Sequence, residues 1–208
     1  MRYSHTKKGQ VMRLRLAQEA ARLIDEHGLR DYHHAKRKAA EHLGAPETHH
    51  LPSNAEVEEA LAEHHRLFMG ERHPVALARL RRTALDAMAL LEGFQPRLVG
   101  PVLSGTAGEN TAITLHVFSD TPEALVFRLL DHHLPFTEGE VRLNSGRHGE
   151  RREITLPTFG FFAGEAEIEL VVFPLKGLRQ PPASPVDGRP MERATPEDVA
   201  RLLETAPA

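Results

Sequence analysis

The hydrophobic period of this sequence changes near Gln95, and that change constrains the fold more than any other feature. Before it, apolar residues recur at three- and four-residue spacing, which predicts amphipathic helices over residues 10–27, 31–43, 53–69 and 74–93. After it, alternation and β-branched residues predict strands at 98–99, 113–118, 141–143, 153–156 and 167–173. One more helix is expected over 121–133. We therefore expect an α+β protein, with a helical N-terminal region followed by a mixed β-sheet with flanking helices.

Start and stop signals divide the chain into three expected regions. Ser53 with Glu56 forms a capping box at the start of a helix, and Thr195 with Asp198 forms a second one near the end of the chain. Residues 178–194 contain four prolines, which predict an extended arm without regular structure. The expected regions are a helical N-terminal region (1–94), a core (95–177), and the arm with a C-terminal helix (178–208).

Two local details are also predicted. The first helix is expected to bury a stripe of apolar residues, formed by Val11, Leu14, Ala17, Ala21 and Ile24. A turn at residues 144–146 is expected to join the strands at 141–143 and 153–156.

The composition excludes several classes of site and location. The 208 residues include no cysteine, so disulfides, thiolate zinc sites and cysteine nucleophiles are excluded, and a cytoplasmic location is expected. The longest uncharged stretches, residues 98–108 and 154–164, fall well short of the roughly 20 apolar residues of a membrane-spanning helix. The basic N-terminus lacks a secretory signal core. We expect no contact with a membrane.

Residues 99–117 combine a strand, a glycine turn, a segment of small residues and a second strand. Within them, Gly100-Pro101 stands ten residues before Ala112-Ile113-Thr114. This spacing resembles the minimal nucleotidyltransferase pattern, in which Gly-Ser is followed after ten residues by Asp-x-Asp on a strand. The segment Gly105-Thr106-Ala107 also matches common members, and the resemblance covers about residues 96–175. It implies a nucleotidyltransferase-like core, in which the turn admits nucleotide phosphates and the two aspartates bind Mg²⁺.

Three positions depart from that family pattern. Pro101 replaces the serine, while Ala112 and Thr114 replace the two aspartates. A methyl group cannot bind a cation and a neutral hydroxyl is a weak ligand, so we expect the loss of Mg²⁺ and of the transfer that depends on it. The third family carboxylate, on a later strand, maps to Glu167 or Glu169. The resemblance implies nucleotide binding by Gly100, Ser104, Gly105, Thr106, Thr114 and His116.

Three hypotheses for the function remain open. The first is a catalytically degenerate nucleotidyltransferase-like protein that binds a nucleotide or RNA, or regulates a partner, through the retained cleft, without a metal or other cofactor. The second is an active, Mg²⁺-dependent nucleotidyltransferase with an atypical carboxylate set, Glu109, Glu167 and Glu169, of which the last two are the candidate catalytic residues. The third is an interaction module whose basic N-terminal helices bind nucleic acid, through Arg30, Lys36, Arg37 and Lys38. Residues 1–43 hold ten Lys and Arg against five Asp and Glu.

Other polar groups have alternative interpretations. His116 is expected on the strand face of Thr114, either as a polar cleft residue or, with Glu109, as a metal ligand. Four adjacent histidine pairs, among them His64-His65, are expected at the solvated surface, because adjacent residues do not share a helix face. The arm is expected to fold over the cleft with Arg179 and Arg189 facing phosphate, to mediate self-association, or to pack along the sheet.

Overall fold

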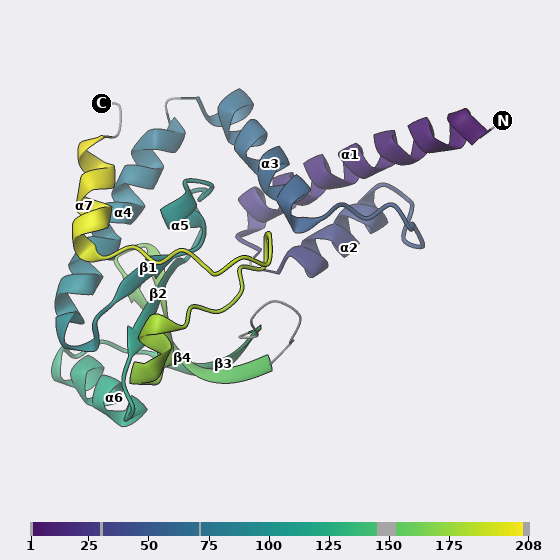
Figure 1. Cartoon of the computed structure of the whole chain (residues 1–208). Coiled ribbons are helices and arrows are strands. Elements are labelled where there is room, and N and C mark those ends of the chain that lie inside the picture. Colours follow the sequence, from purple (N-terminus) through teal and green to yellow (C-terminus); the bar gives the residue numbers. More distant parts are fainter. Residues whose placement is uncertain (1, 30, 71, 145–152, 206–208) are drawn as a thin grey trace.

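The chain folds into N-terminal helices and a mixed sheet, as the change of period predicts. The computed structural model describes residues 2–29, 31–70, 72–144 and 153–205. Three helices lie at one end of the molecule, and a five-stranded sheet with further helices forms the rest (Figure 1). The expected α+β class, with N-terminal helices ahead of a mixed sheet, is confirmed.

The first three helices pack on one another through a small apolar core. They are α1 (Arg2–His27), α2 (Tyr32–His42) and α3 (Asn54–His64), and a five-residue π-helical segment, η1 (His65–Met69), continues α3. The predicted capping box of Ser53 and Glu56 starts α3. Their shared core consists of Leu16, Ala20, Leu23, Ala35, Ala39, Ala40 and Val57.

The predicted buried stripe of α1 is wrong in part. Val11 and Leu14 are 53% and 59% exposed. Leu16, Ala20 and Leu23 instead face α2 and α3. These residues lie about 100° or more around the helix from Val11 and Leu14, since each residue turns an α-helix by about 100°. Two apolar stripes compete on α1, and the position of the neighbouring helices selects one of them.

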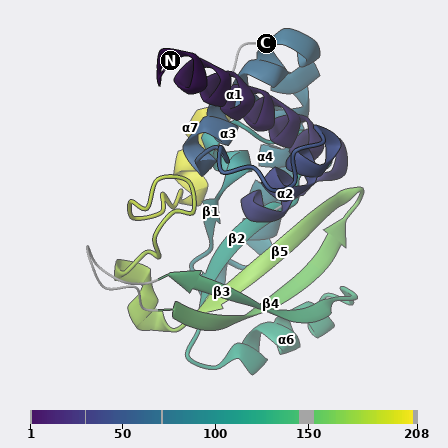
Figure 2. The same ribbon diagram turned by 90° about the vertical axis from the view of Figure 1, so that its right-hand side faces the viewer.

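The sheet has the strand order β1-β2-β5-β4-β3. Its strands are β1 (Arg97–Val99), β2 (Ile113–Phe118), β3 (Thr137–Asn144), β4 (Glu153–Ala163) and β5 (Ala166–Phe173). The β2–β5 pair is parallel and the other three pairs are antiparallel. Figure 2 shows β3 and β4 extending to one side of the sheet, with the N-terminal helices across its upper end. The parallel pair β2–β5 lies in the interior of the sheet.

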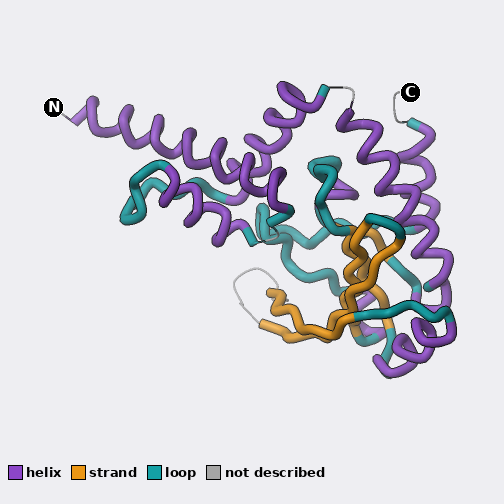
Figure 3. Tube along the Cα trace, turned by 180° about the vertical axis from the view of Figure 1, so that it is seen from behind, coloured by secondary structure: helices purple, strands orange, loops and turns teal. Residues whose placement is uncertain are grey.

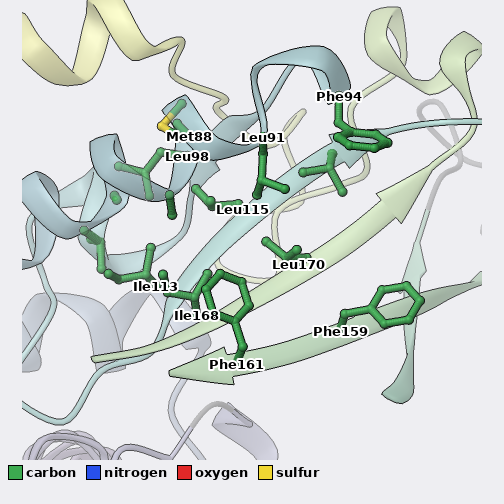
Figure 4. Close-up of a cluster of buried hydrophobic side chains, with 14 of the residues drawn as sticks. Met88, Leu91, Phe94, Leu98, Ile113, Leu115, Phe159, Phe161, Ile168 and Leu170 are labelled. Atoms are coloured by element: carbon green, nitrogen blue, oxygen red, sulfur yellow. The ribbon is translucent and has the colours of Figure 1, made fainter. Parts of the chain in front are cut away.

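One face of the sheet is covered by helices. The helices α4 (Arg72–Leu90), α6 (Pro122–Asp131) and α7 (Pro196–Glu204) contribute apolar residues to the same core as alternate residues of β2 and β5. Figure 4 shows Met88 of α4 among Leu115 of β2 and Leu170 of β5. Because side chains alternate along a strand, Thr114 and His116 of β2 lie on the opposite face. That opposite face is the one that faces the arm and the N-terminal helices.

Several elements differ from the prediction: α1 begins at Arg2 instead of residue 10, and β3 begins at Thr137 instead of residue 141. β4 continues through Pro157 to Ala163, whereas its expected end was residue 156. Pairing of β4 with β5 begins only at Thr158, so Pro157 lies where β4 pairs with β3 alone. On the β5 side no strand is paired there that would need the backbone N–H that proline lacks. A short helix, α5 (Pro101–Ser104), also follows Gly100 where only a turn was expected. Of the predicted turn at 144–146, residues 145 and 146 lie outside the described ranges.

The expected arm has little regular structure, as predicted. It starts with the short 3-10 helix η3 (Leu175–Arg179), and an isolated bridge pairs Ala183 with Pro190. A second bridge, Leu98 to Ala194, attaches the end of the arm to β1. The predicted capping box of Thr195 then starts α7.

The expected region boundary at residue 94 remains a prediction, but the packing of α4 bears on it. A short 3-10 helix, η2 (Glu92–Phe94), connects α4 to β1. Although α4 precedes that boundary, it belongs to the core of the sheet and lies beside α7, as Figures 1 and 3 show. Among the helices of the described ranges, none is both long and apolar enough to cross a lipid bilayer.

Candidate functional site

A cavity of about 560 Å³ lies on the sheet face opposite α4 and α6. Four segments line it: the exposed face of the sheet, the turn after β1 with α5, the N-terminal helices, and the arm. Cavities of roughly 300–1,000 Å³ are typical of sites for small organic ligands. We call this space the cleft.

The turn after β1 forms one wall of the cleft. Gly100 has φ 70° and ψ −154°, a conformation that is largely restricted to glycine. Ser104 Oγ lies 3.0 Å from Thr106 Oγ1, and both residues line the cleft with Gly100. Gly105 does not belong to the lining. With φ 91° it ends α5, and its N–H donates to Pro101 O, so its role is structural.

The sheet forms the floor of the cleft. Thr114 and His116 of β2 and Glu169 of β5 line it, and the parallel register places Thr114 beside Glu169. Glu167 lies on the same face of β5 but is not part of the lining. Of the two candidate catalytic glutamates, the structure therefore brings only Glu169 to the cleft. Ala112, at one of the two positions that carry an aspartate in the family, also lines it.

His116 is the most deeply buried polar group of the cleft. Its side chain is 2% exposed, and its Nδ1 lies 3.0 Å from Nε of Arg193. Burial, and after it the charge of Arg193, lowers the pKa of His116 to about 3. The imidazole is therefore neutral at physiological pH.

Arg193, at the end of the arm, is held on several sides. Its Nη1 donates to Gly177 O at 2.7 Å, and its guanidinium lies 5.0 and 4.7 Å from the ring centroids of Phe118 and Phe173. Burial, and then the charge of Arg97, lowers the pKa of Arg193 to about 10. The group remains charged at neutral pH and fixes the arm to the floor of the cleft.

The remainder of the arm closes the cleft against the N-terminal helices. Residues 184–187 and 189–192 line it, and Asn54 Nδ2 of α3 donates to Pro185 O at 2.7 Å. Arg189 belongs to the lining but its side chain is 85% exposed, and its Nε lies 3.6 Å from Asp187. Arg179 is exposed and does not line the cleft. The arm thus folds over the cleft, which was one of the three expectations.

The N-terminal helices supply a polar pair at the opposite wall. The hydroxyl of Tyr32 donates a hydrogen bond to Glu58, and both residues line the cleft. Burial, and after it the charge of Glu58, raises the pKa of Tyr32. Tyr32 therefore stays protonated, and its hydroxyl donates the hydrogen bond to the Glu58 carboxylate.

Comparisons with known proteins leave the family open. No protein-family model matches this chain, and no curated protein or solved structure is significantly similar to it. The nucleotidyltransferase resemblance is therefore still a prediction from the motif.

Neither of the proposed metal arrangements is found. Glu109 is exposed and absent from the lining of the cleft, so it does not join His116 there. Throughout the part of the chain that the structure describes, no group of three or more histidine, aspartate or glutamate side chains is placed to hold a metal ion.

A buried histidine cluster joins the helical region to the cleft wall. His65 is 2% exposed, its Nε2 lies 2.9 Å from Asp25 Oδ1, and its ring stacks on His73 at 4.3 Å between centroids. The hydrogen bond with His65 lowers the pKa of Asp25. The expectation that His64-His65 is solvated is wrong for His65. Its spacing could have shown this, because Val57, Leu61 and His65 recur every four residues on one helix face.

Of the candidate nucleic-acid-binding residues, Lys36 is engaged in internal contacts. Lys36 Nζ donates to Asn54 Oδ1 at 2.7 Å and to Pro52 O at 3.1 Å. Arg37 is exposed and Lys38 is partly exposed, whereas Arg30 lies outside the described residues. Nearby, Arg13 pairs with Glu56 at 2.6 Å.

Sequence reasoning missed the residues that other segments bring to the cleft, namely Tyr32, Glu58, Glu192 and, behind His116, Arg193. No local pattern distinguishes Arg193 from Arg179 or Arg189, since all three stand in the same proline-rich region. Its importance comes from a contact 77 residues distant in sequence.

Proposed function

We propose that this chain is a nucleotide-binding protein that retains a nucleotidyltransferase-like cleft without nucleotidyl transfer. One observation carries the proposal: five of the six residues that the resemblance implies for nucleotide binding, all except Gly105, line one cleft. They are Gly100, Ser104, Thr106, Thr114 and His116. They lie within a segment of 17 residues (100–116), and residues of one segment need not all face the same cavity.

The lining of the cleft suits the nucleobase and sugar of such a ligand. Its apolar members are enough to cover a planar ring, and its hydroxyl-bearing members can bond a sugar or base edge. The apolar ones include Ile24, Leu29, Leu61, Val99, Leu103 and Val171, and the hydroxyls belong to Tyr32, Ser104, Thr106, Thr111, Thr114 and Ser184.

The absence of transfer follows from the contents of the motif. Transfer of a nucleotidyl group needs divalent cations that neutralise the charge developing on the phosphates. Ala112 and Thr114 provide no carboxylate, and Glu169 is the one glutamate of the candidate catalytic set that lines the cleft. A two-metal site would require further carboxylates grouped around Glu169, and within the described residues no group of three or more such side chains is placed to hold a metal ion.

Two measurements test the proposal. Titration calorimetry with adenine, guanine, cytosine and uracil nucleotides, with EDTA present, is expected to give binding for at least one of the four. Incorporation of labelled nucleotide with Mg²⁺ or Mn²⁺ is expected to be nil. Failure of every nucleoside and nucleotide to bind would refute the binding function, and metal-dependent incorporation would refute the loss of catalysis.

A matched pair of variants locates the site. Thr114→Phe fills the floor of the cleft, and it is expected to weaken binding at least tenfold. Thr155→Phe makes the same change at an exposed position of β4 that is not part of the lining, and it is expected to leave binding unchanged. Equal effects of the two changes would place the ligand elsewhere.

A further inference from the structure

The floor of the cleft holds His116, and its contact with Arg193 determines which of its ring nitrogens accepts and which donates a hydrogen bond. The guanidinium of arginine only donates hydrogen bonds. Arg193 Nε lies 3.0 Å from His116 Nδ1, so Nδ1 accepts and cannot carry the ring proton. A neutral imidazole carries one proton, which is therefore on Nε2. Among the described residues, no hydrogen-bond partner occupies Nε2, and His116 lines the cleft.

This arrangement is held firmly. Arg193 is fixed by Gly177 O and by the rings of Phe118 and Phe173, and His116 also contacts Phe173 at 4.5 Å between centroids. A proton on Nδ1 would oppose the N–H of Arg193, and a ring flip would place a C–H there; in either case a buried donor of Arg193 loses its acceptor, which is costly. The cleft floor therefore presents a fixed donor, and its ligand must present an acceptor there.

The charge of the lining adds a second constraint. Asp187 of the lining lies beside Arg189, and Glu58 and Glu192 are two further carboxylates of the lining. Within the described ranges, Glu58 and Glu192 have no cationic partner. A polyphosphate without its metal ions would be repelled by this wall, because like charges at close range oppose binding.

We propose that the cleft selects the nucleoside part of a nucleotide and discriminates against its phosphate chain. The selected ligand places an acceptor atom of its base or sugar on the Nε2–H of His116. Arg193 acts as a positioning residue that holds this tautomer. The inference rests on the proposed nucleotide-binding function. The proposed preference for the nucleoside over the triphosphate is the reverse of that of a metal-dependent transferase, which takes the triphosphate.

Calorimetry with a matched series tests the charge selection. For the base that binds, the nucleoside, its monophosphate and its triphosphate are titrated at pH 7.5 and low salt, with EDTA present. The nucleoside is expected to bind at least tenfold tighter than the triphosphate, and the gap is expected to shrink as salt is added, because salt screens the repulsion. A triphosphate that binds as tightly as the nucleoside would overturn the inference while leaving the proposed function intact. No binding by any member would instead remove the proposed function itself.

The tautomer is tested by nitrogen NMR of the histidine side chains, on protein labelled with ¹⁵N histidine. The His116 ring, assigned by the loss of its signals in His116→Asn, is expected to carry its proton on Nε2, and that signal is expected to shift when the nucleoside binds. A proton on Nδ1, or a signal unmoved by the bound nucleoside, would overturn the proposal. This result needs no variant of Arg193 and stays informative if such variants fold poorly.

Variants of Arg193 then test its positioning role. Arg193→Met removes the donor, and the His116 signals are expected to show both tautomers while nucleoside affinity falls about threefold to tenfold. Arg193→Lys retains a donor and is expected to restore part of both effects. Arg201→Met, an exposed change on α7, is the control. A folded Arg193→Met protein that keeps the wild-type tautomer and affinity would contradict the role.

Discussion

Replacement of His116 by asparagine should remove a large part of the acid sensitivity of this protein. In the unfolded chain a histidine takes up its proton near pH 6.5, whereas burial, with the charge of Arg193 adding to it, lowers the pKa of the folded His116 to about 3. As the pH falls below 6.5, the unfolded state binds a proton that the folded state does not bind. The stabilising contribution of neutral His116 is therefore complete above pH 6.5 and is lost progressively toward pH 3.

The size of this effect follows from the two pKa values. One pKa unit corresponds to about 1.4 kcal/mol, so the whole interval amounts to about 5 kcal/mol, of which about 2 kcal/mol is lost by pH 5. That is a large part of the roughly 5–15 kcal/mol by which domains are stable. The side chain is 2% exposed, so solvent screening does little to reduce it.

Urea unfolding followed by far-UV circular dichroism, at pH 7.5 and pH 5.0, measures the loss. The wild-type protein is expected to lose about 2 kcal/mol more between these two values than the His116→Asn variant. The substitution itself lowers stability at both pH values, so the readout is the difference between them. His132→Asn, an exposed histidine on the C-terminal side of α6, is the control and should behave as wild type. The reasoning is refuted if His116→Asn and wild type lose the same free energy.

Three further predictions concern stability at pH 7.5, measured by urea unfolding. Gly100→Ala should cost about 1–3 kcal/mol through backbone strain alone, because no atom lies within 4 Å of the added Cβ; a cost under about 0.5 kcal/mol would contradict this. Ser53→Ala removes the side-chain acceptor of the Glu56 N–H and should cost about 0.5–2 kcal/mol, whereas no change would show that water replaces the cap. Leu115→Ala in the main core should cost about 2–5 kcal/mol, while Leu67→Ala, 58% exposed, should stay within about 0.5 kcal/mol.

The histidine cluster suggests what holds the N-terminal helices in position beside the sheet and its loops. Asp25 belongs to α1, His65 to η1 and His73 to α4, and the Asp25 carboxylate lies against Gly108 in the loop before β2. A Cβ at Gly108 would collide with the Asp25 carboxylate, so a larger residue there would require Asp25 to shift from its contact with His65. Residues of α1 and of this loop also line the cleft, so the shape of the cleft depends on the contact between Asp25, His65 and Gly108.

Much of the local structure was predictable from the sequence. The helices, the strands of the core, both capping boxes and the irregular arm follow from spacing and caps that involve residues within a few positions of one another. That reasoning was wrong for the buried stripe of α1 and for the end of β4, which continues to Ala163. In each case the local pattern allowed two outcomes, and a neighbouring element decided between them.

Within the site, the motif at residues 99–117 shows the same division between what the local sequence predicts and what contacts with distant segments decide. The resemblance that it carries implied six binding residues, and five of them line the cleft. It did not predict that Gly105 would cap α5, since a glycine in a small-residue loop has several uses. Nor could it predict the contact between His116 and Arg193, which depends on where the arm returns to the sheet.

By itself, then, the sequence determined the change from helical to β period at Gln95, the starts of α3 and α7, and the absence of carboxylates at Ala112 and Thr114. Tertiary structure alone decided the contact of His116 with Arg193 and the position of the arm over the cleft. Periodicity and capping are short-range and operate within one or two turns of chain. The cleft is assembled from segments more than 100 residues apart, and only the packing of the whole chain brings them together.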